Sequence, residues 1–173
     1  IDEFTSADTK AWYVKHCIPF RRGYLFYGLP GTGKTSTILA IASYLESCIY
    51  RVNLVAPGLT DDGLLQAVNT AKKGGIVVFE DVDSLFGVHR NKEEVFSVTF
   101  SGLINAIDGL GDTRRGLMFV LTSNHVERLD PALLRKGRID LKVSFNSFGP
   151  SELAAMFKRF YPECDDDLAI EFA

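Results

Sequence analysis

The stretch Gly28-Leu-Pro-Gly-Thr-Gly-Lys-Thr35 decides the fold of this chain. It matches the pattern GxxxxGK[ST], in which glycines let backbone N–H groups turn toward phosphate oxygens. The apolar run GYLFY (23–27) before it is typical of a buried strand, and the residues after it predict an amphipathic helix over 34–47. Because the pattern is specific in this strand–loop–helix context, we predict a phosphate-binding loop (P-loop) at 28–35.

Each part of this loop has an expected partner in a bound nucleotide. The Lys34 ammonium is expected to reach the β- and γ-phosphates, and the Thr35 hydroxyl is expected to bind Mg²⁺. The N-terminus of the following helix adds the positive end of its dipole. The sequence therefore predicts ATP and Mg²⁺ as cofactors. The expected nucleotide-binding residues are Gly28, Leu29, Pro30, Gly31, Thr32, Gly33, Lys34, Thr35 and Ser36.

Strands and helices are predicted to alternate along the rest of the chain. Further strands are expected over 49–55, 76–79, 117–121 and 139–145. Further helices are expected from Thr60 to Gly74, over 95–108, over 130–137 and from a Ser151 cap onward. Continuous apolar strands between amphipathic helices indicate a mostly parallel sheet covered on both faces. The predicted fold is therefore an α/β three-layer sandwich of the P-loop NTPase kind.

Two acids follow the apolar strand at 76–79. Ligands bind at the carboxyl ends of parallel strands, so Glu80 and Asp81 are expected to meet the P-loop. By position, Glu80 faces the Mg²⁺ shell together with Thr35, and Asp81 polarises the attacking water. The usual order of the two acids is the reverse, and which of them polarises the water stays open.

A polar residue also follows the strand at 117–121. Asn124 carries a donor and an acceptor, so it is expected to orient the water and to report which nucleotide is bound. Further along, Arg135 and Arg138 straddle a predicted helix end. Arginine from a neighbouring subunit can neutralise charge on a γ-phosphate. The alternative is a helix terminus with cations that suit its dipole, and spacing does not decide between them.

Composition narrows the classes of function. The chain has 173 residues, with 22 acidic and 19 basic side chains and a net charge of −3, which disfavours a nucleic-acid partner. Its three cysteines are far apart and show no CxxC spacing, so neither zinc nor a disulfide framework is expected. No apolar run approaches the length of a membrane span. The first residue is Ile1, and we expect a fragment whose targeting or membrane segments lie before it.

Taken in order, the P-loop, the acid pair, Asn124 and DPALLRKGRID (130–140) resemble the AAA family of ring ATPases from Gly23 to Phe145. Within that family, the chain resembles the mitochondrial inner-membrane members that move the folded Rieske iron–sulfur protein during respiratory complex III assembly. The narrower resemblance rests on the Glu-Asp order and on several stretches. These are Trp12-Tyr13, IPFRRGYLFYGLPGTGKTS (18–36), GLTDDGLL (58–65), VTFSGLINAIDGL (98–110), SNHVERL (123–129) and FKRFYPE (157–163).

The resemblance implies an ATPase core at 1–147 and the truncated start of a helical lid at 148–173. It implies a homo-oligomeric ring of seven subunits, with six as the alternative, facing the matrix at the mitochondrial inner membrane. Membrane contact would come only through segments absent from this chain. The implied cargo is a protein, the Rieske protein among them, and not nucleic acid. By position, the catalytic residues would be Glu80, Asp81, Asn124, Arg135 and Arg138.

Other functions remain open at this stage. One is an ATPase of the same subfamily with a different cargo, and another is an ATP-dependent switch or scaffold with little turnover. A nucleic-acid remodeller is disfavoured by charge, and a P-loop kinase would leave Asn124 and the paired arginines without a purpose. The stretch 55–65 lacks the aromatic residue with which ring ATPases usually grip an unfolded chain, which favours a folded cargo.

Overall fold

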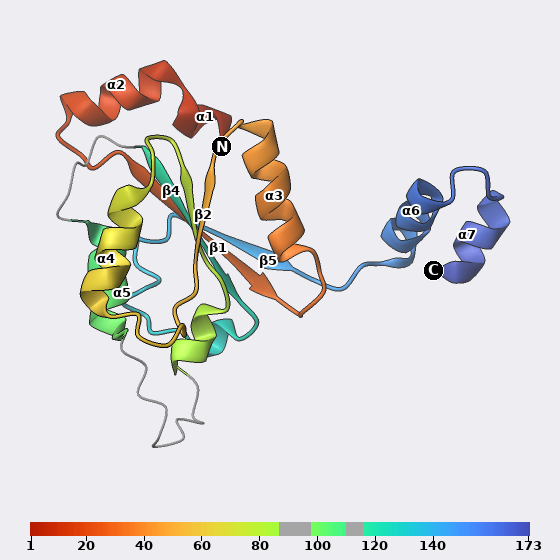
Figure 1. Ribbon diagram of the computed structural model, residues 1–173. Helices are drawn as coiled ribbons and strands as arrows, with labels where there is room; N and C mark the ends of the chain where they lie inside the picture. The colour runs from red at the N-terminus through yellow and green to blue at the C-terminus, as the bar shows by residue number, and fades with distance from the viewer. Residues whose placement is uncertain (87–97, 110–115) are drawn as a thin grey trace.

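The computed structural model describes residues 1–86, 98–109 and 116–173. The described residues form one five-stranded sheet in the order β2-β3-β4-β1-β5 (Figure 1). Every pairing in it is parallel. The strands are β1 (Arg21–Gly28), β2 (Ile49–Val52), β3 (Ile76–Phe79), β4 (Leu117–Ser123) and β5 (Leu141–Phe145). This order inserts β4 between β1 and β3, so the strands that carry the polar motifs are neighbours.

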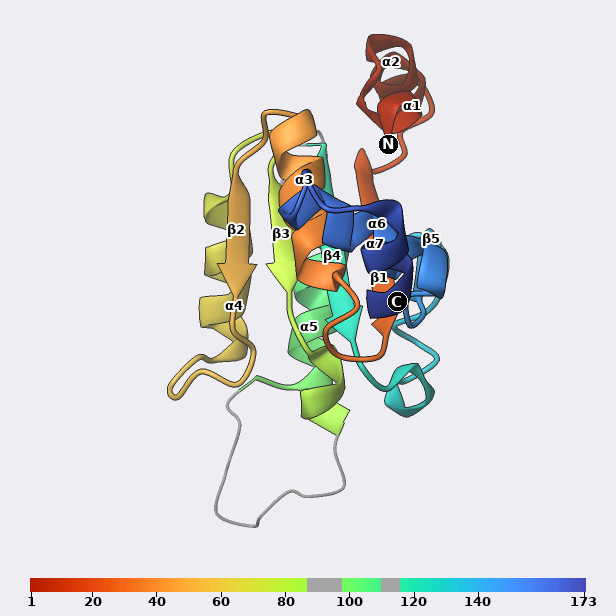
Figure 2. The same cartoon turned by 90° about the vertical axis from the view of Figure 1, so that its right-hand side faces the viewer.

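Helices cover both faces of the sheet. They are α3 (Lys34–Tyr44) on one face and α4 (Asp61–Thr70) with α5 (Phe100–Asp108) on the other (Figures 1 and 2). Because side chains alternate along a strand, Val77 and Phe79 of β3 pack with the α4 and α5 residues, whereas Ile76 and Val78 pack with Ile38 of α3. The predicted three-layer α/β fold is confirmed.

Two helices precede the sheet where none was predicted. They are α1 (Asp2–Thr5) and α2 (Ala7–Lys15). Ser6 caps α2 by accepting a hydrogen bond from the Thr9 amide at 3.1 Å. Phe4 of α1 is buried beside Phe20, with ring centroids 4.7 Å apart. This contact ties the amino-terminal helices to the start of β1.

Several predicted elements have different bounds in the structure. The strand expected over 49–55 ends at Val52, because the Asn53 side chain turns the backbone by accepting the Val55 amide at 3.1 Å. The helix expected from Thr60 has Thr60 as its cap and ends at Thr70. The helix expected over 95–108 begins at Phe100, and the part of that prediction before residue 98 lies outside the described residues.

Two predictions of helix starts are wrong. Residues 130–137 form turns rather than a helix, because Asp130 accepts the Ala132 amide through its side chain at 2.7 Å and holds a local turn. The last long helix, α6 (Pro150–Phe160), begins two residues earlier than predicted, with Gly149 rather than Ser151 at its cap. Proline is favoured at the first helical position, since its missing N–H would be unpaired there anyway.

The chain ends in a helical hairpin of α6 and α7 (Asp166–Phe172). Phe157 packs on the Phe172 ring at 4.7 Å, and Lys158 forms an ion pair with Asp166. The hairpin stands apart from the sheet and joins it through residues 146–149 (Figure 1). Within the described ranges, no helix has both the length and the apolar character needed to cross a membrane.

Candidate nucleotide site

The carboxyl ends of three adjacent strands bring the P-loop, the acid pair and Asn124 together. The P-loop follows β1, the acid pair follows β3 and Asn124 follows β4. The ladder register pairs Phe79 with Leu121 and Tyr27 with Ser123, so these strands end side by side. Sites at this edge are the rule in open parallel sheets.

The P-loop backbone depends on glycine. Gly28, Gly31 and Gly33 have φ angles of 141°, 78° and 92°, which side-chain-bearing residues rarely adopt. A Cβ at Gly28 would also lie 2.0 Å from the Phe145 carbonyl oxygen of β5. The loop leads directly into α3 at Lys34, whose N-terminus receives no side-chain cap from the described residues. Its first-turn N–H groups are therefore suited to an anion.

The Lys34 ammonium is satisfied by three oxygens of its own chain. Nζ lies 2.8 Å from each of the Gly28 carbonyl, the Leu29 carbonyl and Asn124 Oδ1. Lys34 is only 8% exposed, and a buried ammonium requires this full set of acceptors. The same geometry suits phosphate oxygens, which could replace the two loop carbonyls.

Glu80 lies between the P-loop and the edge strand β2. Thr35 Oγ1 donates to Glu80 Oε1 at 3.1 Å, and Arg51 of β2 forms an ion pair with Glu80 Oε2. A hydroxyl and a carboxylate side by side fit Mg²⁺, which prefers oxygen ligands. The sequence analysis does not predict Arg51 as a site residue. In the sequence, Arg51 is a charged residue in an edge strand, and such residues more often face solvent.

Asp81 and Asn124 form a second connection. Asn124 Nδ2 donates to Asp81 Oδ1 at 3.3 Å, while its Oδ1 accepts from Lys34. The Asp81 amide donates to Thr122 Oγ1 at 2.9 Å, and Asp81 has a φ of 48°, a conformation that costs on the order of 1–3 kcal/mol. The buried Asp83 carboxylate accepts a hydrogen bond from the backbone amide of Asn124 at 3.2 Å. Asn124 therefore bridges the P-loop lysine and the second acid.

The remaining predicted P-loop residues make fewer side-chain contacts. Thr32 is buried and donates to the Leu29 carbonyl at 2.7 Å, which closes the loop on itself. Leu29, Pro30 and Ser36 are exposed. The residues present thus fit a magnesium–nucleotide complex, with Lys34 and the α3 N-terminus for phosphates and Thr35 with Glu80 for the metal.

Arg138 is bound within its own chain. Its Nη2 and Nε lie 2.7 and 3.0 Å from Asp108 Oδ2, and its Nη1 donates to the Ala132 carbonyl at 2.7 Å. The hydrogen bond to Asp108 raises the pKa of Arg138 above its ordinary value. Arg21 also pairs with Asp108, at 3.1 Å. Burial lowers the pKa of Arg21, and Asp108 opposes that shift.

These arginines lie away from the chain's own P-loop. Asp140 Oδ2 accepts the Gly23 amide at 2.9 Å, so the segment after Arg138 docks on the amino-terminal half of β1. The P-loop follows the other end of that strand. Arg135 is exposed, unlike Arg138. The structure therefore does not bring either arginine together with Lys34 of the same chain.

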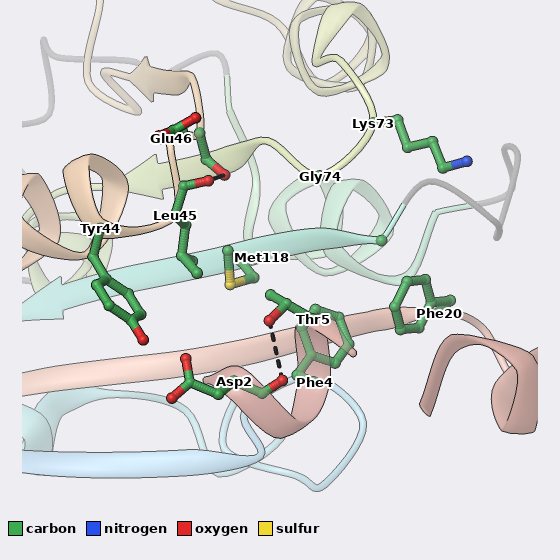
Figure 3. Close-up of a pocket in the computed structure, with 12 residues that line it drawn as sticks. Asp2, Phe4, Thr5, Phe20, Tyr44, Leu45, Glu46, Lys73, Gly74 and Met118 are labelled. Atoms are coloured by element: carbon green, nitrogen blue, oxygen red, sulfur yellow. Dashed lines mark hydrogen bonds between the residues drawn. The ribbon is translucent and has the colours of Figure 1, made fainter. Parts of the chain in front are cut away.

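A cavity of about 550 Å³ lies at the amino-terminal ends of the strands, away from the P-loop (Figure 3). Its lining combines rings and aliphatic groups with two acids and one lysine. The residues are Asp2, Phe4, Thr5, Phe20, Tyr44, Leu45, Glu46, Ser47, Lys73, Gly74, Gly116 and Met118. None of them belongs to the P-loop, the acid pair or the Asn124 motif, so the nucleotide site rests on the side-chain geometry described above.

Comparison with known proteins supports this assignment. Residues 24–147 match the family described as "ATPase family associated with various cellular activities (AAA)". The chain belongs to the AAA ATPase family. AAA domains bind nucleotide, usually with Mg²⁺, which agrees with the chemistry of Lys34, Thr35 and Glu80.

Individual AAA relatives cover most of this chain. It is 46% identical over 164 residues to a probable mitochondrial chaperone bcs1 of Schizosaccharomyces pombe. This match covers 91% of the chain and 36% of that protein. It is 43% identical over 173 residues to mitochondrial chaperone BCS1 of Homo sapiens, with 96% and 41% covered. It is 40% identical over 173 residues to probable mitochondrial chaperone BCS1-A of Dictyostelium discoideum, with 95% and 41% covered. The chain spans less than half the length of these relatives.

The shared position of Asp108 between two arginines gives a stability prediction. Asp108→Ala should lower the free energy of unfolding by about 1–3 kcal/mol, because two guanidinium groups lose a charged acceptor. Urea denaturation followed by circular dichroism measures the change. The control is Glu163→Ala, an exposed acid between α6 and α7, which should change stability by less than about 0.5 kcal/mol. Equal effects of the two substitutions would show that the Asp108 cluster does not stabilise the fold.

Proposed function

We propose that this chain binds ATP with Mg²⁺ at the P-loop and hydrolyses it as the motor domain of a homo-oligomeric ring. The observation that carries this proposal is the link from Lys34 through Asn124 to Asp81. It joins a phosphate-binding cation to a carboxylate through a side chain that can respond to both. Membership of the AAA family supports ATPase activity in general.

The proposed mechanism assigns each side chain one task. Lys34 exchanges the Gly28 and Leu29 carbonyls for β- and γ-phosphate oxygens. Thr35 and Glu80 would hold Mg²⁺, which when bound neutralises charge on the phosphates. Asp81 accepts a proton from the water that attacks the γ-phosphorus, and ADP leaves on the opposite side. Asn124 holds Asp81 and the water in line.

Arg135 and Arg138 are the proposed trans-acting residues. Arg135 is exposed and is free to approach the nucleotide of a neighbouring subunit. Arg138 would first have to exchange Asp108 for phosphate, because three of its hydrogen bonds go to that carboxylate. The effect of a trans arginine on phosphoryl transfer is large, about 10³-fold or more.

The proposed biological role is protein translocation at the mitochondrial inner membrane, on the matrix side. Its basis is the similarity to proteins named mitochondrial chaperones. We propose a ring of seven subunits, with six as the alternative, and a folded protein cargo such as the Rieske iron–sulfur protein in complex III assembly. The lack of an aromatic residue at 55–65 supports a folded cargo. Residues 148–173 are proposed to begin the lid that follows the core at 1–147.

Two substitutions should separate binding from hydrolysis. Lys34→Ala should weaken ATP binding at least tenfold, because the phosphates lose their cation. Asp81→Asn should keep ATP binding and slow hydrolysis by about 10²- to 10⁴-fold, because the general base is lost. Fluorescent nucleotide titration and phosphate release from the assembled full-length ring measure the two steps. Unchanged turnover in both Asp81→Asn and Glu80→Gln would refute the role of the acid pair.

Mixed rings test whether the arginines act between subunits. Rings made only of Arg135→Ala or only of Asp81→Asn should hydrolyse ATP slowly while binding it normally. Mixing the two should restore part of the activity, because some interfaces then combine an intact Asp81 with a neighbour's intact Arg135. The measurement is phosphate release against mixing ratio. If mixing never raises the rate above that of the parent rings, Arg135 does not act in trans.

A further inference from the structure

Arg51 is a charged residue at the site that lies outside all of the sequence motifs. It lies in β2, the edge strand next to β3, where the ladder register pairs it with Val78. Two residues beyond Val78, the chain reaches Glu80. This register brings the Arg51 guanidinium to Glu80 Oε2, with which it forms an ion pair.

Both oxygens of Glu80 are engaged in this arrangement. Oε2 accepts from Arg51, and Oε1 accepts from the Thr35 hydroxyl at 3.1 Å. Thr35 and Glu80 are the two side chains that the proposed function assigns to Mg²⁺. The guanidinium therefore supplies positive charge to the same carboxylate that a bound metal would use.

The exposure of the two partners makes the contact reversible. The Arg51 side chain is 65% exposed and that of Glu80 is 25% exposed. A guanidinium so open to water can swing away without leaving a buried charge unpaired. Exposed ion pairs contribute little to stability, so this one can orient a carboxylate and still yield to a divalent cation.

We propose that Arg51 is a positioning residue that holds Glu80 beside Thr35 and competes with Mg²⁺ for it. The proposal rests on the proposed function, since it takes Glu80 as part of the metal shell. Arg51 keeps the carboxylate beside Thr35 and raises the Mg²⁺ concentration needed to complete the site. Metal entry and departure of the guanidinium are then one exchange.

Removing the charge at position 51 tests this competition. Arg51→Met should lower the Mg²⁺ concentration that gives half-maximal tightening of ADP binding by about two- to fivefold, the range expected from an exposed ion pair. ADP affinity in EDTA should stay unchanged. Fluorescent ADP titrations of the full-length protein over a Mg²⁺ series give both values. Arg51→Lys keeps the charge and should remain near wild type.

A matched control and a double variant separate competition from structural effects. Arg159→Met removes an exposed arginine from α6 and should leave the Mg²⁺ dependence unchanged. In a Glu80→Gln background, Arg51→Met should have no further effect, because the carboxylate for which Arg51 competes is absent. If Arg51→Met does not fold, Arg51→Gln replaces it, with the same shift expected.

The outcomes distinguish this inference from the function on which it rests. If wild-type binding of ADP depends on Mg²⁺ but Arg51→Met shows the same or a higher half-saturating concentration, the competition is refuted and the nucleotide site stands. A shift of equal size in the Glu80→Gln background also refutes it. If wild-type binding shows no dependence on Mg²⁺, the metal site and the role of Arg51 fall together.

Discussion

The site depends on how one buried positive charge is satisfied. Lys34 reaches two carbonyls of its own loop and the side-chain oxygen of Asn124, and no fewer acceptors would suit an ammonium so far from water. The strand order meets this requirement, because β4 lies beside β1 and Asn124 can therefore reach the P-loop lysine. The same requirement also gives the P-loop a defined shape, and we propose that phosphate oxygens replace the two loop carbonyls there.

Two adjacent acids gain different surroundings from the same strand end. Asp81 is tied to Asn124, and through it to the phosphate-binding lysine. Glu80 is tied to Thr35 and Arg51. The backbone of Asp81, in the left-handed region, accompanies this separation of the two carboxylates. The division of labour that we propose, with Glu80 for the metal and Asp81 for the water, follows from these neighbours more than from the order of the residues.

Local patterns predicted most of the fold and which strand ends lie together at the candidate site. Apolar strands, the P-loop and the strand-end acids can be recognised from a few consecutive residues, because local periodicity and backbone conformation determine them. Contacts between residues far apart in the sequence could not be predicted from such local patterns. Asp108 holds Arg138 across 30 positions, and Arg51 meets Glu80 only through the pairing of β2 with β3. The sequence around Asp130 predicts a helix start where the structure has a turn, because an aspartate side chain can accept backbone amides in both.

We propose that Lys34 exchanges its internal oxygens for those of a nucleotide. A crystal structure of the protein with Mg²⁺ and a non-hydrolysable ATP analogue tests it most directly. We expect Lys34 Nζ within hydrogen-bonding distance of β- and γ-phosphate oxygens, and no longer bound to the Gly28 and Leu29 carbonyls. A nucleotide bound elsewhere, such as in the cavity at the amino-terminal ends of the strands, with the Lys34 contacts unchanged, would contradict this proposal.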